Sequence, residues 1–132
     1  MTNEDKFKLI TRNLEEVLTE EELKTLIDSK TPLKHYIGFE ISGRVHLGTG
    51  LVCMQKVKDF QDAGCEVLIL LADWHTWLNN KLDGTLETAN KMARSYFEEG
   101  LKAGYLCLGG NPDDIKFVLG SELYMENSNK YW

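Results

Sequence analysis

The 132-residue chain lacks any apolar stretch approaching the roughly 18 residues that a membrane-spanning helix needs. Its first residues, Met1 to Asp5, are too polar and acidic for a secretory signal peptide. An excess of basic residues is also missing, because 15 Lys and Arg stand against 21 Asp and Glu. The net charge of -6 argues against binding nucleic acid through a general basic field. We therefore expect a cytoplasmic protein with no membrane partner, in which any contact with RNA is local.

Clustered metal ligands are scarce as well. The sequence has no Cys-x-x-Cys pair, and its three cysteines are far apart, which favours free, at least half-buried thiols: Cys53, Cys65 and Cys107. The three histidines do not lie four residues apart on one predicted helix: His35, His46 and His75. The sequence therefore predicts neither a disulfide framework nor a metal site built from protein ligands.

Helices and strands are predicted to alternate within one domain, which is large enough to bury roughly two thirds of its unfolded surface. Residues 1–30 are expected to form two short helices, the first with Phe7, Ile10 and Leu14 at helical spacing. Strands are predicted at 36–40, 67–72 and 115–119. Longer helices are predicted over 47–63, with Gly64 as a left-handed cap, and over 86–103, ending near Gly104.

This β-α-β-α-β order predicts an α/β fold, half of a Rossmann-like, doubly wound parallel sheet, over residues 31–132. In such sheets the binding crevice lies at the carboxyl ends of the strands. The continuous apolar run 67–72 predicts a strand that is covered on both faces. Trp74, Trp77 and Leu78, just after this strand, are more typical of core residues than of a cofactor site.

The segment 36–50 leads from the first predicted strand through glycines and a histidine into a predicted helix. A helix start exposes N–H groups and the positive end of the helix dipole, so it stabilises a bound phosphate. Gly48 has no Cβ and would let a base or sugar lie against the backbone, while His46 adds a side-chain donor. The segment predicts a nucleotide-phosphate site.

Three blocks of sequence carry a family resemblance. His46-Leu47-Gly48-Thr49 resembles the HIGH signature of class I aminoacyl-tRNA synthetases, with Thr49 in place of the second histidine. Together with two further blocks it is similar to the N-terminal half of archaeal and eukaryotic-type tyrosyl-tRNA synthetases: Tyr36-Ile37-Gly38-Phe39-Glu40 with Ser42-Gly43, and Leu70-Leu71-Ala72-Asp73-Trp74-His75. The resemblance extends over nearly the whole chain, from about Lys8 onward.

The resemblance implies ATP-dependent activation of L-tyrosine, with Mg²⁺ accompanying ATP, and transfer of the tyrosyl group to tRNA(Tyr) in a homodimeric enzyme. It implies His46 and Thr49 as catalytic residues. Implied ATP-binding residues are Gly38, Glu40, His46, Gly48, Thr49, Ser121 and Glu122. Implied tyrosine-binding residues are Tyr36, Gly38, Glu40, Leu70, Asp73 and His75.

Other interpretations stay open at this level. Tyr36 is also an ordinary strand aromatic, and Asp73 is also a typical helix cap. The chain contains no KMSKS-like sequence, so we expect the N-terminal half of a catalytic domain, whose uncovered apolar surface, including Trp132, favours self-association. A small adenylyltransferase with an HxGH motif and a noncatalytic ATP-binding or assembly module are the alternative functions.

Overall fold

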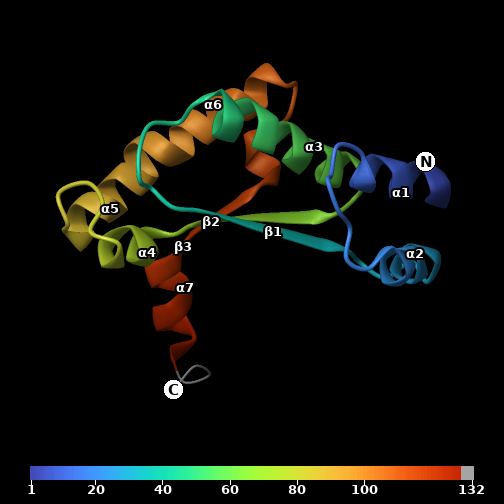
Figure 1. Cartoon of the computed structure of the whole chain (residues 1–132), viewed down its shortest axis with the longest axis horizontal. Helices are drawn as coiled ribbons and strands as arrows, with labels where there is room; N and C mark the ends of the chain where they lie inside the picture. The colour runs from blue at the N-terminus through green and yellow to red at the C-terminus, as the bar shows by residue number, and fades with distance from the viewer. Residues whose placement is uncertain (129–132) are drawn as a thin grey trace.

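The computed structural model describes residues 1–128, so the predicted contact at Trp132 lies outside the described residues. Helices and strands alternate along the chain (Figure 1). Their bounds are α1 Asn3–Thr11, α2 Glu20–Asp28, β1 Lys34–Phe39, the π-helical turn η1 Gly48–Cys53, α3 Met54–Asp62, β2 Glu66–Leu71, α4 Asp73–Leu78, α5 Leu86–Met92, the π-helical turn η2 Ala93–Phe97, α6 Glu98–Cys107, the 3-10 turn η3 Pro112–Asp114, β3 Lys116–Leu119 and α7 Gly120–Glu126.

The strands form one parallel sheet in the order β1-β2-β3, which confirms the predicted α/β fold. Phe39 is paired with Leu71 and Leu71 with Leu119, so all three strands end level with one another. The chain leaves this edge directly into α4 after β2 and into α7 after β3 (Figure 1). The residues that follow the three strands therefore gather at one edge of the sheet.

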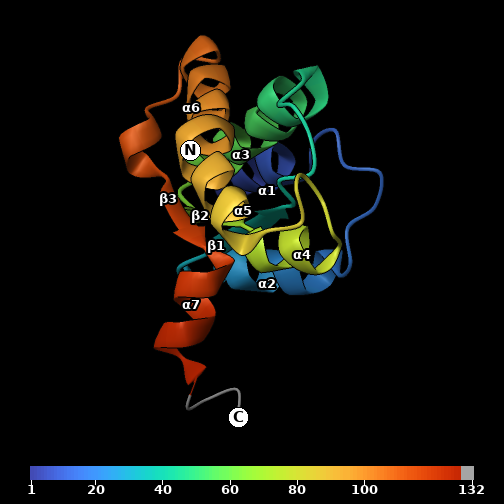
Figure 2. The same cartoon turned by 90° about the vertical axis from the view of Figure 1, so that its left-hand side faces the viewer.

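The core lies between the sheet and the helices α3 and α6, which cover one of its faces (Figure 2). Val67, Ile69 and Leu71 of β2 belong to this core, because alternate side chains of a strand share a face. On the opposite face Leu70 is buried but Leu68 is only half-buried. The predicted cover on both faces of β2 is thus complete on one face and partial on the other.

A second, small apolar cluster joins the two N-terminal helices to the sheet. Ile10 of α1 and Ile27 of α2 pack there with Ala63 and Cys65, which precede β2. The predicted helical stripe was wrong at Leu14, because α1 ends at Thr11 and Leu14 is exposed. The N-terminal helices therefore pack against the start of β2, far from the strand ends.

A buried carboxylate fastens α1 to α3. The Arg12 guanidinium donates to both oxygens of Asp59, at 2.8 and 2.5 Å, and the Gln55 amide donates to it at 3.1 Å. The Asp59 side chain is only 1% exposed. Burial alone would raise the pKa of this carboxyl, but Arg12, Gln55 and the Lys56 ammonium outweigh burial and lower the pKa below its usual 3.8.

Gly104 does not end its helix, as the sequence had suggested, because the helix continues to Cys107. A Cβ on Gly104 would lie 2.0 Å from the carbonyl oxygen of Gly50, so the glycine allows α6 to touch the backbone of η1. The left-handed residue that follows the helix is Gly109, with φ +76°. Gly64, with φ +82° after α3, does occupy the predicted left-handed position.

Two predicted core residues lie on the surface. Trp77 is 43% exposed and Leu78 is 69% exposed, whereas Asp73 and Thr76 of the same helix are buried. The short helix α4 turns its Asp73–Thr76 side toward the protein, so Trp77 and Leu78 face outward. The thiol of Cys107 is also exposed, against the expectation of a buried or half-buried cysteine.

Gly104→Ala should destabilise the chain by about 3 kcal/mol, because α6 must move away from a rigid backbone atom rather than from a flexible side chain. Urea unfolding followed by circular dichroism measures the loss. Gly43→Ala is the control, since a Cβ there meets nothing within 4 Å. Equal stability of the two variants would contradict the close helix contact.

Asp59→Asn should cost about 2 kcal/mol at pH 7, because it removes the charge that Arg12 and Lys56 stabilise. The lowered pKa of Asp59 means that its contribution is present above about pH 4 and disappears as the pH falls through the native pKa. Wild type and variant should thus converge in urea unfolding near pH 2. Asp62→Asn, which affects an exposed ion pair with Lys58 on the same helix, should change little. A pH-independent difference for Asp59→Asn would contradict the account.

Candidate functional site

The two faces of β1 differ because side chains alternate along a strand. His35 and Ile37 face the α3 side, whereas Tyr36 and Gly38 face the other side together with Leu70 of β2. A cavity of about 370 Å³ lies on this second face, at the carboxyl ends of β1 and β2. Its lining comprises five of the six predicted tyrosine-binding residues and two others: Tyr36, Gly38, Glu40, Leu70 and His75, with Ala72 and Asn79.

Gly38 leaves room for the phenol of Tyr36. A Cβ on Gly38 would lie 3.3 Å from the hydroxyl oxygen of Tyr36 and 3.8 Å from Cδ2 of Leu70. Tyr36 itself is 63% exposed, so the ring is accessible rather than packed in the core. Its hydroxyl lies over the glycine, beside an apolar wall, where it can meet a polar group of a ligand.

Glu40 and Asn79 form a polar wall of the same cavity. The Asn79 amide Nδ2 donates to Oε1 of Glu40 at 2.5 Å. Asn79 follows the last residue of α4, four positions after His75, which places both on one side of that helix. The sequence interpretation missed Asn79, although this spacing from a predicted site residue could have indicated it.

The loop after β1 folds around His46. The backbone N–H of Gly48 donates to Nδ1 of His46 at 3.1 Å, so the proton of the neutral ring is on Nε2. The Thr49 hydroxyl accepts from the N–H of His46 and donates to its carbonyl, both at 3.2 Å. Gly50 also donates to that carbonyl, at 2.7 Å. The predicted free N–H groups of this helix start are thus partly used inside the loop, while the imidazole Nε2–H faces outward on an exposed residue.

Asp73 lies outside the cavity lining and fastens α4 to α7. Its side chain is fully buried, and Oδ1 accepts the N–H of Ser121 at 2.9 Å. The carboxylate approaches so closely that a Cβ on Gly120 would lie 3.0 Å from Oδ1. Glu122 is paired with Arg94 at 2.7 Å but stays exposed, and Ser121 beside it is half-buried.

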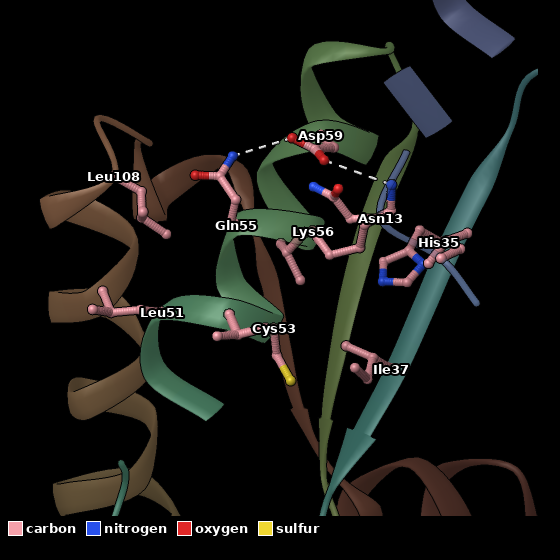
Figure 3. A pocket seen from close by; sticks show the side chains of 12 residues that line it. Asn13, His35, Ile37, Leu51, Cys53, Gln55, Lys56, Asp59 and Leu108 are labelled. Carbon is pink, nitrogen blue, oxygen red and sulfur yellow. Dashed lines mark hydrogen bonds and ion pairs between the residues drawn. The ribbon is translucent and has the colours of Figure 1, made fainter. Parts of the chain in front are cut away.

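A larger cavity, about 540 Å³, lies on the opposite face of β1, between this strand and α3 (Figure 3). His35, Ile37, Cys53 and Lys56 line it, and none of the predicted site residues does. Burial and the Lys56 ammonium lower the pKa of His35, which stacks on Phe60 with ring centres 4.1 Å apart. This cavity is mainly apolar, so the polar groups at the strand ends make the smaller cavity the better candidate site.

Within residues 1–128 no three His, Cys, Asp or Glu side chains are grouped so that they could hold a metal ion. In the same described part of the chain, no helix is both long and apolar enough to cross a membrane.

Comparison with known proteins gives consistent matches. Residues 28–131 match the family model of the class I tRNA synthetases (W and Y). Tyrosine–tRNA ligases of Thermococcus gammatolerans and Pyrobaculum arsenaticum are 50% and 53% identical over 133 aligned positions that cover 100% of this chain. The chain spans only 35% and 36% of the lengths of these two relatives.

Solved structures of tyrosyl-tRNA synthetases also match this chain. The crystal structure of tyrosyl-tRNA synthetase from Pyrococcus horikoshii, complexed with L-tyrosine, superposes with a TM-score of 0.93 at 45% identity. The match covers 99% of this chain and 35% of that one. The Leishmania major enzyme in complex with tyrosinol superposes with a TM-score of 0.86 at 32% identity and covers 100% of this chain and 19% of its own.

Gly48→Ala should release the imidazole of His46, because the added Cβ would lie 2.9 Å from Cε1 and 3.0 Å from Nδ1 of the ring. Long-range ¹⁵N–¹H NMR of the ring nitrogens reports the tautomer. We expect the neutral ring to be in the Nε2–H form in the wild type and to be a mixture of tautomers in Gly48→Ala. The Gly43→Ala variant should keep the wild-type spectrum, and a mixture already present in the wild type would contradict the described geometry.

Proposed function

The chain belongs to the class I tRNA synthetases of the tryptophan and tyrosine group, and from this we propose that it contributes the ATP site and part of the tyrosine site of a tyrosine–tRNA ligase. The matches confirm the resemblance to archaeal tyrosyl-tRNA synthetases that the sequence predicted. In the proposed reaction, a carboxylate oxygen of tyrosine attacks the α-phosphate of ATP. The bond to the β-phosphate breaks, pyrophosphate leaves, and tyrosyl adenylate is formed. A terminal hydroxyl of tRNA(Tyr) then attacks the carbonyl carbon of the adenylate, so that an ester bond forms and AMP leaves.

The cavity at the ends of β1 and β2 is the observation that carries the tyrosine assignment. Leu70 supplies an apolar wall for an aromatic ring, and the Tyr36 hydroxyl is placed to bond the phenol of a bound tyrosine. His75 adds a second polar edge. Glu40 is the one acidic residue of the lining, so its carboxylate would attract the ammonium group of an amino acid. We retain Asp73, which directly follows Ala72 of the lining, as a proposed residue of the tyrosine site.

We place ATP against the loop between β1 and η1. Gly38 and Glu40 lie where the cavity meets this loop, and Gly48 offers close approach to the backbone. His46 supplies the Nε2–H donor and Thr49 a hydroxyl for the phosphates as negative charge builds up on them. Donors that are in place before the reaction lower the barrier without a covalent intermediate.

The remaining assignments complete the nucleotide site. The Ser121 hydroxyl and Glu122, at the start of α7, are the proposed adenosine contacts. Mg²⁺, bound together with ATP, would neutralise part of the charge of the leaving pyrophosphate. Since the chain provides no metal cluster within residues 1–128, this ion would be held mainly by phosphate oxygens.

The proposed domain division, RNA substrate, oligomeric state and location refer to an enzyme as long as the relatives named above. We propose that residues 1–30 form a helical extension and residues 31–132 the first half of a Rossmann catalytic domain. The proposed enzyme acts on tRNA(Tyr) as a homodimer in the cytoplasm, as a synthetase serving translation would.

A chimera tests the function. This chain replaces the aligned 35% of the Thermococcus gammatolerans ligase, and exchange of pyrophosphate into ATP is measured with and without L-tyrosine. We expect tyrosine-dependent exchange, and His46→Ala should lower its rate by about 10² to 10³-fold, the usual effect of losing one donor to developing charge.

Circular dichroism must first show that the chimera folds like the parent ligase. A folded chimera without tyrosine-dependent exchange would contradict the function. Exchange that instead depends on pantetheine phosphate or a nucleotide acceptor would favour the small adenylyltransferase. If His46→Ala lowered the exchange rate by less than about threefold, the catalytic role of His46 would be contradicted.

A further inference from the structure

Asn79 has a contact that its position in the chain does not explain. It directly follows the short helix α4, is exposed, and yet donates from Nδ2 to Oε1 of Glu40 at 2.5 Å in the wall of the cavity. The bond joins two segments 39 positions apart in sequence. Hydrogen bonds to a charged acceptor are stronger than those between neutral groups.

A buried anchor fixes the helix that carries Asn79. The hydroxyl of Thr76 accepts the N–H of Ile41 at 2.8 Å and donates to the carbonyl of Ala72 at 3.0 Å. Thr76 is fully buried and lies one helical turn before Asn79. Two successive contacts from one side of α4 thus hold Glu40 and Ile41, the two residues that follow β1.

The contact leaves half of the carboxylate available. Among residues 1–128, Asn79 is the one hydrogen-bond partner of the Glu40 side chain, so Oε2 of this lining residue has no hydrogen bond there and can accept one from a ligand. A glutamate without such a partner samples several rotamers and must be ordered when a ligand binds. A partner that selects one rotamer beforehand removes this cost.

We propose that Asn79 is a positioning residue, which holds Oε1 of Glu40 so that Oε2 points to the cationic group of the bound amino acid. The proposal rests on the proposed function, because it assigns Asn79 to the same amino-acid site. Asn79 acts through Glu40, so its removal should affect the affinity for tyrosine and leave folding unchanged.

Isothermal titration of the folded chimera with L-tyrosine provides the test. Asn79→Ala should raise the Kd about tenfold, with the thermal midpoint unchanged, and Glu40→Ala should raise it at least as much. The double variant Asn79→Ala, Glu40→Ala should bind no more weakly than Glu40→Ala alone. Additive losses, or a wild-type Kd in Asn79→Ala, would overturn the proposal.

Asn3→Ala is the matched control. Asn3 also donates from Nδ2 to an exposed carboxylate, that of Asp28 at 3.0 Å, but it lies on α1 and outside the cavity lining. Its removal should leave the Kd for tyrosine unchanged. A loss equal to that of Asn79→Ala would show a general effect of removing such a bond and would overturn the proposal.

NMR of the ligand-free chain separates this inference from the function on which it rests. Glu40→Ala should shift the side-chain amide signals of Asn79 and leave those of Asn3 in place. Unchanged Asn79 signals would overturn the inference even if tyrosine binds. If the chimera shows no tyrosine-dependent exchange, the proposed function fails, and the amide shifts alone decide whether Asn79 holds Glu40.

Discussion

The parallel register of the three strands is the constraint on which the site depends. Because Phe39, Leu71 and Leu119 are level, the residues after each strand, including Glu40, Asp73 and Ser121, meet at one edge although they are far apart in sequence. Side-chain contacts then fix this edge: Thr76 holds the backbone after β1, and Asp73 holds the start of α7. A slip of one residue would reverse the face of every side chain on β1 and move Tyr36 into the core.

Glycines then determine how closely these elements approach. Gly104 brings α6 against η1, which fixes the helix that begins beside His46. Gly38 opens the other face of β1 and leaves the Tyr36 hydroxyl over an empty position rather than over a side chain. The same strand therefore contributes Phe39 to a packed core on one face and a ligand-sized cavity on the other.

The sequence was sufficient for the features that depend on local pattern. Strand and helix order, the left-handed Gly64 and the loop at His46 follow from periodicity, turn chemistry and a family motif. The sequence alone was insufficient to predict contacts that join distant segments. The atom that Gly104 approaches closely belongs to the backbone of another helix, and the partner of Asn79 follows a different strand. The spacing from His75 could point to Asn79, but no local pattern shows which residue it contacts.

The central claim is that amino-acid binding occurs on the Tyr36 face of β1 and not in the larger cavity on the His35 face. Amide chemical shifts of the ¹⁵N-labelled chain, recorded during titration with L-tyrosine, test this directly, because the two faces can be read from neighbouring residues of one strand. We expect saturable shifts that centre on Gly38, Leu70 and His75. Shifts that centre instead on Cys53 and Lys56, which line the larger cavity, would contradict the account.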